Sequence, residues 1–200
     1  MTRAGRAMSE QLERRVGPLT SLRLGQIRGA AQKIIGHAAV FDRLSEDLGG
    51  FRERVAPGAF TATLKSADIL ASFNHNPNLI LGRNKSGTLR LKEDLTGLAV
   101  EIDVPETSIG RDAITAVKRG DVDQMSFGFH TVNDRWTKSD GGWIRTLLDV
   151  DLFDVSLATF AACSQTDATV RAFEAAKRGE TLPGKEWRIA LRRLRLDLER

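Results

Sequence analysis

The sequence predicts a mainly β fold with peripheral helices (α+β), arranged as a barrel or as a strongly curved antiparallel sheet. Segments in which apolar and polar residues alternate recur along the centre of the chain, and this alternation is typical of strands. Turn signals separate these segments, and the strongest is Asp140-Gly141-Gly142 between the two longest of them. Helical spacing is clear at residues 107–120 and again beyond residue 170.

Three elements are expected before residue 87. Residues 1–27 lack a clean periodicity, and order is expected to begin with an apolar strand at residues 33–42. The following stretch is punctuated by glycines and prolines and is expected to be a loop, with a short helix after Pro57. A strand at residues 69–73 then leads into a polar turn.

A hairpin is expected next, because residues 87–94 and 97–104 both alternate and are separated by a short polar segment. The helix at residues 107–120 repeats an apolar residue every four positions. It has two basic residues in its last turn and Gly120 where a helix commonly stops. Two long strands are expected next: residues 124–132 and 143–160.

The composition indicates a globular protein. The chain has 200 residues, of which 41% are hydrophobic and 28% charged, enough for one domain with a core and additional tails. No apolar run approaches the roughly 18 residues of a membrane helix, and no secretory signal is visible. Cys163 is the single cysteine, which excludes an internal disulfide and suits a reducing cytoplasm.

Basic residues are concentrated at the two ends of the chain. Residues 1–33 carry seven basic and two acidic side chains, and residues 170–200 carry nine and five, although the net charge of the whole chain is +4. We therefore divide the chain into a flexible basic arm (1–30), a central domain (31–170) and a basic helical tail (171–200). The absence of tyrosine and the 6% aromatic content argue against a nucleic-acid-binding module.

Three residue types suited to nucleophilic catalysis occur in or beside the expected strands: His75, Ser126 and an aspartate of "DVDLFDVSL". A serine hydroxyl is a poor nucleophile at neutral pH unless a base, usually histidine, lies within hydrogen-bonding reach. That base needs a partner on its other ring nitrogen, and a carboxylate supplies it. Taken singly, each residue has an ordinary explanation as a packed hydroxyl, a turn residue and a solvated strand carboxylate.

The aspartates of the last long strand fall into two sets. Asp154 alternates in register with Val150 and Leu152, on the face opposite Asp149 and Asp151. One set is expected to face the core or a site, and an inward carboxylate implies a partner because an unpaired buried charge is costly.

The remaining histidines, His37 and His130, are interpreted as ordinary strand positions. Three isolated histidines and one cysteine form no zinc signature, so we expect no metal and no cofactor.

Several blocks in a fixed order resemble one known family. They are "GHAAVFD", "SEDLGGFRERVAPGAF", "FNHNPNLILGR", "SGTLRLKED", "TGLAVEIDVP", "KRGDVDQMSFGF" and "LLDVDLFDVSLATF", between about Ile35 and Val170. Over this range the chain resembles the prohead serine protease family of tailed phages, the capsid maturation proteases. The resemblance implies a fold like the herpesvirus assemblin protease, which is a closed β-barrel with peripheral helices.

The resemblance also implies residue roles within the central domain, which then becomes a protease domain. The histidine of "FNHNP" is the general base, which falls on His75, and the serine of "QMSFGF" is the nucleophile, which falls on Ser126. The context "FDVSL" places Asp154 as the orienting carboxylate, with Asp151 and Asp149 as the alternatives.

Two further expectations concern the surroundings of this site. The segment "TFAACSQT" departs from the family wording, and the loop after the last strand is expected to supply backbone N–H groups to the oxyanion hole. Gly128 is expected to leave room for the backbone of a substrate beside Ser126.

The function implied by the resemblance is that of a serine endopeptidase acting inside the assembling phage prohead, in the host cytoplasm. Its substrates are then the scaffold or the major capsid protein, and the protease itself. Assemblin-like enzymes are often activated by dimerisation, so the resemblance makes a homo-oligomer possible, although the sequence does not give the oligomeric state. The candidate surface is an apolar stripe on the tail: Trp187, Leu191, Leu194 and Leu198.

Two alternatives stay open from the sequence. The first is a non-catalytic capsid-assembly scaffold factor that keeps a protease-like fold. In that case replacing Ser126 with alanine leaves capsid maturation intact. The second is a nucleic-acid-binding protein working through its basic ends, whose affinity would fall steeply with salt.

Overall fold

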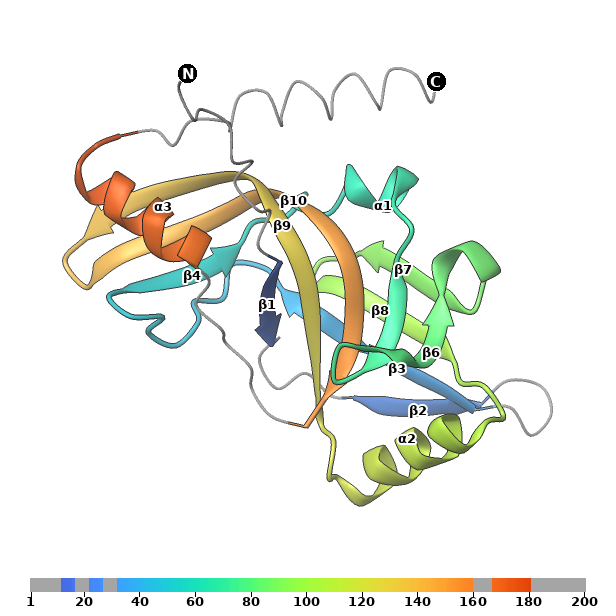
Figure 1. The fold of residues 1–200 in the computed structure, drawn as a ribbon. Coiled ribbons are helices and arrows are strands. Elements are labelled where there is room, and N and C mark those ends of the chain that lie inside the picture. The colour runs from blue at the N-terminus through green and yellow to red at the C-terminus, as the bar shows by residue number, and fades with distance from the viewer. Residues whose placement is uncertain (1–11, 17–21, 27–31, 160–166, 181–200) are drawn as a thin grey trace, which may run out of the picture.

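A computed structural model of the protein describes residues 12–16, 22–26, 32–159 and 167–180 (Figure 1). Within these ranges the strands form two sheets. The six-stranded sheet contains β1 (Glu13–Val16), β9 (Gln124–Ser139), β10 (Gly142–Ala158), β5 (Leu70–Phe73) and β6 (Asn76–Arg83) in that order, with β4 (Phe51–Val55) also paired to β10. The four-stranded sheet has the order β2 (Arg23–Gln26), β3 (Gln32–Val40), β8 (Gly97–Asp103) and β7 (Leu89–Glu93).

The mainly β class is confirmed, but the closed barrel is not. In the described part of the chain, the paired strands belong to two separate sheets, and no ladder joins one sheet to the other. Closure into a barrel requires each edge strand to pair with another, and the terminal strands of these two sheets do not pair across.

The β9–β10 hairpin, which contains the two longest strands among the described residues, was correctly predicted. Figure 1 shows both strands running curved across the structure. The turn uses Asp140 and Gly141, and Gly142 has a φ of 106°, a conformation that glycine adopts without strain. β10 pairs with β9 along its length, with β4 through Trp143–Leu147 and with β5 through Asp154–Leu157, both of these parallel.

Between these two parallel partners, the free edge of β10 is covered by the segment around α1 (Thr63–Ser66). The N–H of Val150 donates to the carbonyl of Ala59 at 3.1 Å, and the N–H of Leu152 donates to the Thr63 hydroxyl at 3.0 Å. The backbone donors in this stretch therefore stay satisfied although no strand lies beside them.

The hydrophobic core lies between the two sheets. One contiguous cluster contains buried side chains of the four-stranded sheet, such as Ile34 and Ile102, together with Phe127 and Phe129 of β9. The rings of Phe127 and Phe60 meet edge to face with centroids 5.6 Å apart. This packing fixes which face of β9 is apolar, and hence which face is left for other chemistry.

The remaining described helices are peripheral. α2 (Ser108–Arg119) has Thr107 as its N-cap and ends at Gly120, whose φ is 78°, as its sequence predicts. A short 3₁₀ helix, η1 (Asn84–Ser86), follows β6. α3 (Asp167–Lys177) packs Phe173 against Phe51 and the two tryptophans near the turn of the β9–β10 hairpin.

Two sequence-based expectations need correction. β1 and β2 lie in the region predicted to be a flexible arm, so that prediction fails for residues 13–16 and 23–26. β4 lies in a segment predicted to be a loop. Its alternation was obscured because the inward position between Phe51 and Val55 is the charged residue Glu53.

Two further expectations concern the tail and membrane-spanning helices. The predicted apolar stripe of the tail lies outside the described residues. Among the described helices, none is both long and apolar enough to cross a membrane.

Candidate active site

Ser126 lies on the face of β9 that points away from the hydrophobic core. Met125, Phe127 and Phe129 occupy the core face, so Ser126 and Gly128 alternate onto the other. Ser126 is nevertheless fully buried, with 0% of its surface exposed. Its backbone is opposite Ser156 of β10 on one side and opposite Val16 of β1 on the other.

His75 is presented by a tight turn between β5 and β6. Phe73 pairs with Asn76, so Asn74 and His75 are the two turn residues, and their φ values are 51° and 54°. Two positive φ values define a type I′ hairpin turn, in which asparagine is favoured at the first position but histidine at the second is strained. The turn is held because the N–H of Asn74 donates to the Leu157 carbonyl at 2.8 Å.

Asp154 reaches the same face as Ser126 because β10 contains a bulge. Leu152 is opposite Phe129 and Asp154 is opposite Gly128, so Phe153 is an extra residue in the ladder. The simple alternation, which placed Asp154 on the same face as Leu152, is therefore wrong. Beyond the bulge the core face passes to Val155, while Asp154 faces the site.

Ser126, His75 and Asp154 form a continuous hydrogen-bonded relay. His75 Nε2 lies 2.7 Å from Ser126 Oγ, and His75 Nδ1 lies 2.6 Å from Asp154 Oδ2. A carboxylate facing Nδ1 favours the tautomer in which Nδ1 carries the proton, and this leaves Nε2 as the acceptor beside the serine hydroxyl. The His75 and Asp154 side chains are 6% and 14% exposed, so this relay is largely shielded from water.

Ser156 connects the backbone of His75 to the carboxylate of Asp154. Its hydroxyl accepts the His75 N–H at 3.0 Å and donates to Asp154 Oδ2 at 3.1 Å. Ser72 lies 2.6 Å from the same hydroxyl, and because Ser156 has one proton, Ser72 acts as the donor. These two buried serines fix the strained turn and the carboxylate relative to each other.

Gly128 makes room for Asp154, a role that the sequence did not indicate. A Cβ placed on Gly128 would lie 2.1 Å from Asp154 Oδ1, far inside contact distance. The missing side chain of Gly128 therefore allows the bulged strand to turn its carboxylate toward His75.

Gly128→Ala is expected to displace Asp154 from His75. It should lower any hydrolytic rate that depends on this relay at least about 10²-fold, because displacing a catalytic group by about 1 Å can have that effect. The measurement is kcat together with thermal unfolding, which should show a folded protein. Gly141→Ala is the matched control, since a Cβ there meets nothing within 4 Å. A Gly128→Ala variant that cleaves at the wild-type rate would contradict this role.

The other candidate residues lie elsewhere. His37 pairs with Asp94 on the four-stranded sheet, where His37 Nε2 is 2.9 Å from the carboxylate. His130 packs its ring edge against Phe153, with centroids 4.6 Å apart. Asp149 and Asp151 lie on β10 before the bulge, opposite Asn133 and His130. A surface hollow of roughly 550 Å³ is on the four-stranded sheet, away from the relay, and its lining includes Arg23, His37, Arg90 and Lys92.

Sequence reasoning missed Ser156, Ser72 and the backbone of Arg15, whose carbonyl accepts a hydrogen bond from Ser126 at 2.8 Å. The spacing Asp-Val-Ser in "FDVSL" places Ser156 two residues after Asp154, on one face of the strand, and this was the available signal. Residues 160–166, where oxyanion-hole donors were expected, lie outside the described ranges.

Comparison with known proteins identifies the family. Residues 21–180 match the family described as Caudovirus prohead serine protease. Among solved structures, the chain is similar to the capsid assembly protease gp21 of bacteriophage T4, with a TM-score of 0.52 and 8% sequence identity. That similarity covers 74% of this chain and 98% of the other, and at this identity it shows a shared fold. No curated protein sequence gives a significant match. Because the family match spans most of the sequence, the chain belongs to the caudovirus prohead serine protease family.

Proposed function

We propose that this protein is a serine endopeptidase in which Ser126 is the nucleophile, His75 the general base and Asp154 the orienting carboxylate. The single observation that carries the proposal is the relay from Asp154 through His75 to Ser126, with contacts of 2.6 and 2.7 Å. Membership of a serine protease family supports it independently. A relay of hydroxyl, imidazole and carboxylate recurs on unrelated folds, and geometry rather than sequence position identifies it.

The relay accounts for both halves of peptide hydrolysis. Ser126 Oγ attacks the scissile carbonyl carbon while its proton passes to His75 Nε2. The C–N bond then breaks, His75 returns that proton to the leaving amine, and an acyl-enzyme remains on Ser126. A water molecule attacks the acyl carbon while His75 again takes a proton. The bond from the acyl carbon to Ser126 Oγ then breaks, His75 returns that proton to Oγ, and the acid is released.

Asp154 acts throughout by holding Nδ1–H and by stabilising the imidazolium that forms in each half of the reaction. It is itself held by Ser156, which donates to the same oxygen that faces His75.

The proposed substrates are the major capsid protein or scaffold and the protease itself, and the proposed place of action is the inside of the assembling prohead in the host cytoplasm. The family description supports this, as does the similarity to a protein named a capsid assembly protease. These substrates are proteins packed in the same shell, so a modest catalytic rate would suffice for each enzyme molecule.

Co-expression with the major capsid protein of the same phage tests the proposal. We expect the wild-type chain to shorten the capsid protein or its scaffold on a denaturing gel, and Ser126→Ala to abolish the shortening while the variant stays folded. A fluorophosphonate should add one label to wild type, detected by intact mass, and none to Ser126→Ala.

Ser86→Ala, at an exposed serine of η1, is the matched control and should behave as wild type. Capsid maturation that continues unchanged with Ser126→Ala would favour the alternative, a non-catalytic assembly factor with a protease-like fold.

A further inference from the structure

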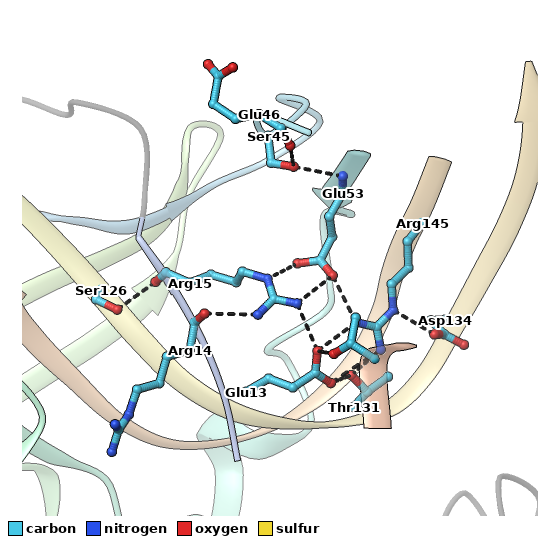
Figure 2. Close-up of polar contacts among 11 residues, drawn as sticks. Glu13, Arg14, Arg15, Ser45, Glu46, Glu53, Ser126, Thr131, Asp134 and Arg145 are labelled. Carbon is cyan, nitrogen blue, oxygen red and sulfur yellow. Dashed lines mark hydrogen bonds and ion pairs between the residues drawn. The ribbon is translucent and has the colours of Figure 1, made fainter. Parts of the chain in front are cut away.

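The strand β1 covers the edge of β9 where the proposed nucleophile lies. The two strands are antiparallel, with Val16 opposite Ser126 and Arg14 opposite Gly128. The hydroxyl of Ser126 donates to the carbonyl of Arg15 at 2.8 Å (Figure 2). A backbone carbonyl of the chain itself therefore lies within reach of Ser126, where the scissile carbonyl of a substrate would have to be.

The hydrogen bond to Arg15 competes with the proposed catalytic one. A serine hydroxyl carries a single proton and can donate it to one acceptor at a time. In this arrangement two acceptors are available: the carbonyl of Arg15 at 2.8 Å and Nε2 of His75 at 2.7 Å. When the proton points to Arg15, His75 cannot remove it as Ser126 attacks.

Near Ser126, only one edge of β9 could bind a peptide substrate. Its other edge is paired with β10 along the whole segment around Ser126. An extended peptide can add to a sheet only at a free edge, where backbone groups are unpaired. Beside Ser126 that edge is already taken by β1, and Ser126 has no exposed surface.

A buried cluster of charges holds β1 in this position. Arg15 Nε lies 2.8 Å from Glu53 of β4, and Arg15 Nη2 lies 2.9 Å from Glu13 of β1 itself. Arg145 of β10 contacts both carboxylates, at 2.7 Å from Glu13 and 2.9 Å from Glu53. These four side chains are between 2% and 5% exposed, and Figure 2 shows that they converge on the side of β1 away from Ser126.

We propose that β1 is a self-blocking strand, held by the cluster of Glu13, Arg15, Glu53 and Arg145, and that it must leave the edge of β9 before a peptide substrate can reach Ser126. The proposal rests on the proposed protease function. It adds that the edge of β9 at residues 126–129 is the peptide-binding edge and that the chain itself is its first occupant. Four residues form few backbone bonds, so the charge cluster is the main restraint on β1.

Labelling of the full-length protein with a fluorophosphonate tests the proposal. The variant Arg15→Gln removes the ion pairs of Arg15 with Glu53 and with Glu13. It keeps the length of β1 and the carbonyl of residue 15 that faces Ser126. We expect it to label about tenfold faster than wild type, because weakening the closed state raises the population of the open one. Arg52→Gln is the matched control: it neighbours Glu53 on β4 but is exposed, and it should label at the wild-type rate.

Amide hydrogen exchange of residues 13–16 gives a second readout that does not depend on any substitution. In wild type, these amides should lose protection once Ser126 carries the label, because the label occupies the place of the Arg15 carbonyl. The proposal would be overturned if labelled protein kept full protection of the β1 amides from exchange. It would also be overturned if Arg15→Gln lowered that protection but reacted with the fluorophosphonate no faster than wild type. If no variant labels although exchange shows β1 to be open, the proposed protease function fails instead.

Discussion

Replacing His75 with alanine is expected to lower kcat for peptide cleavage by about 10⁶-fold, and replacing Asp154 with asparagine by about 10⁴-fold. Without the imidazole, nothing in the relay takes the proton of Ser126, so the loss should equal that of Ser126→Ala. The double variant should be no slower than either single one, because residues that act as one unit are strongly non-additive.

The expected effect of Asp154→Asn follows from the atoms that meet at Nδ1. The carboxylate now accepts from Nδ1–H at 2.6 Å and from the Ser156 hydroxyl at 3.1 Å. An amide in its place offers one oxygen and one NH₂ group, and an NH₂ group facing His75 would favour a proton on Nε2. His75 Nε2 would then be a hydrogen-bond donor, although it must accept the proton of Ser126.

Asp151→Asn is the matched control, since Asp151 was an alternative for the third role and lies on the same strand before the bulge. The measurement is kcat and KM on a peptide that the wild type cleaves, with thermal unfolding of each variant. The assignment would be wrong if Asp151→Asn lost the activity and Asp154→Asn kept it.

The sequence was sufficient to predict the three relay residues and most elements that carry them. "FNHNP" and "QMSFGF" pointed to His75 and Ser126 through the family resemblance, and both the long hairpin and α2 followed from local patterns. Asp154, to which "FDVSL" pointed through the same resemblance, lies beside His75, but the simple alternation that grouped it with Val150 and Leu152 was wrong. A bulge at Phe153 reverses the face of the strand, and nothing in the alternation marks an inserted residue.

Two of the missed strands, β1 and β4, share a physical cause. β1 and β4 place charged side chains, Arg15 and Glu53, at inward positions, so neither shows the apolar alternation by which strands are found. Each charge is tolerated only because the other strand supplies its counterion, and a partner 38 residues away leaves no local signal. The same cause hid the contact between Arg15 and Ser126.

The two faces of the six-stranded sheet around β9 therefore carry different groups of residues. One face carries the relay of Ser126, His75 and Asp154. Near the other, ion pairs join Glu13 and Arg15 to Glu53 and Arg145 across three different strands. The backbone of β1 lies between the two, because its Arg15 has a side chain in the ion cluster and a carbonyl at Ser126.

Arg145→Met is expected to have the largest effect on stability. Arg145 is 2% exposed and contacts Glu13, Glu53 and Asp134 at 2.7 to 2.9 Å. Removing one partner from a buried ion pair typically costs about 3–5 kcal/mol, because the remaining charges stay buried without compensation. For a chain of this length, that loss lowers Tm by on the order of 10 °C. Arg119→Met is the control, since its ion pair with Asp121 is exposed and should contribute less than about 1 kcal/mol.

The pH dependence of this loss separates the charge effect from lost packing. Burial alone would raise the pKa of Glu13, but Arg145, Arg15 and the hydroxyl of Thr131 lower it from 4.5 to about 2. Thr169 of α3 also donates to this carboxylate. In wild type, the ionised Glu13 therefore stabilises the fold above pH 4.5, and this contribution is lost as pH falls toward 2.

Without Arg145, the pKa of Glu13 rises, because burial favours the neutral carboxyl. As pH falls, protonation of Glu13 then removes an unpaired buried charge from the variant. At lower pH, the wild type loses the stabilisation that the ionised Glu13 gave it. The difference in free energy of unfolding between Arg145→Met and wild type should thus shrink as pH falls through 4.5, when chemical denaturation is followed from pH 7 to pH 3. A difference that stays constant over that range would mean that Arg145 acts through packing, and the charge cluster would then not be what holds β1 beside Ser126.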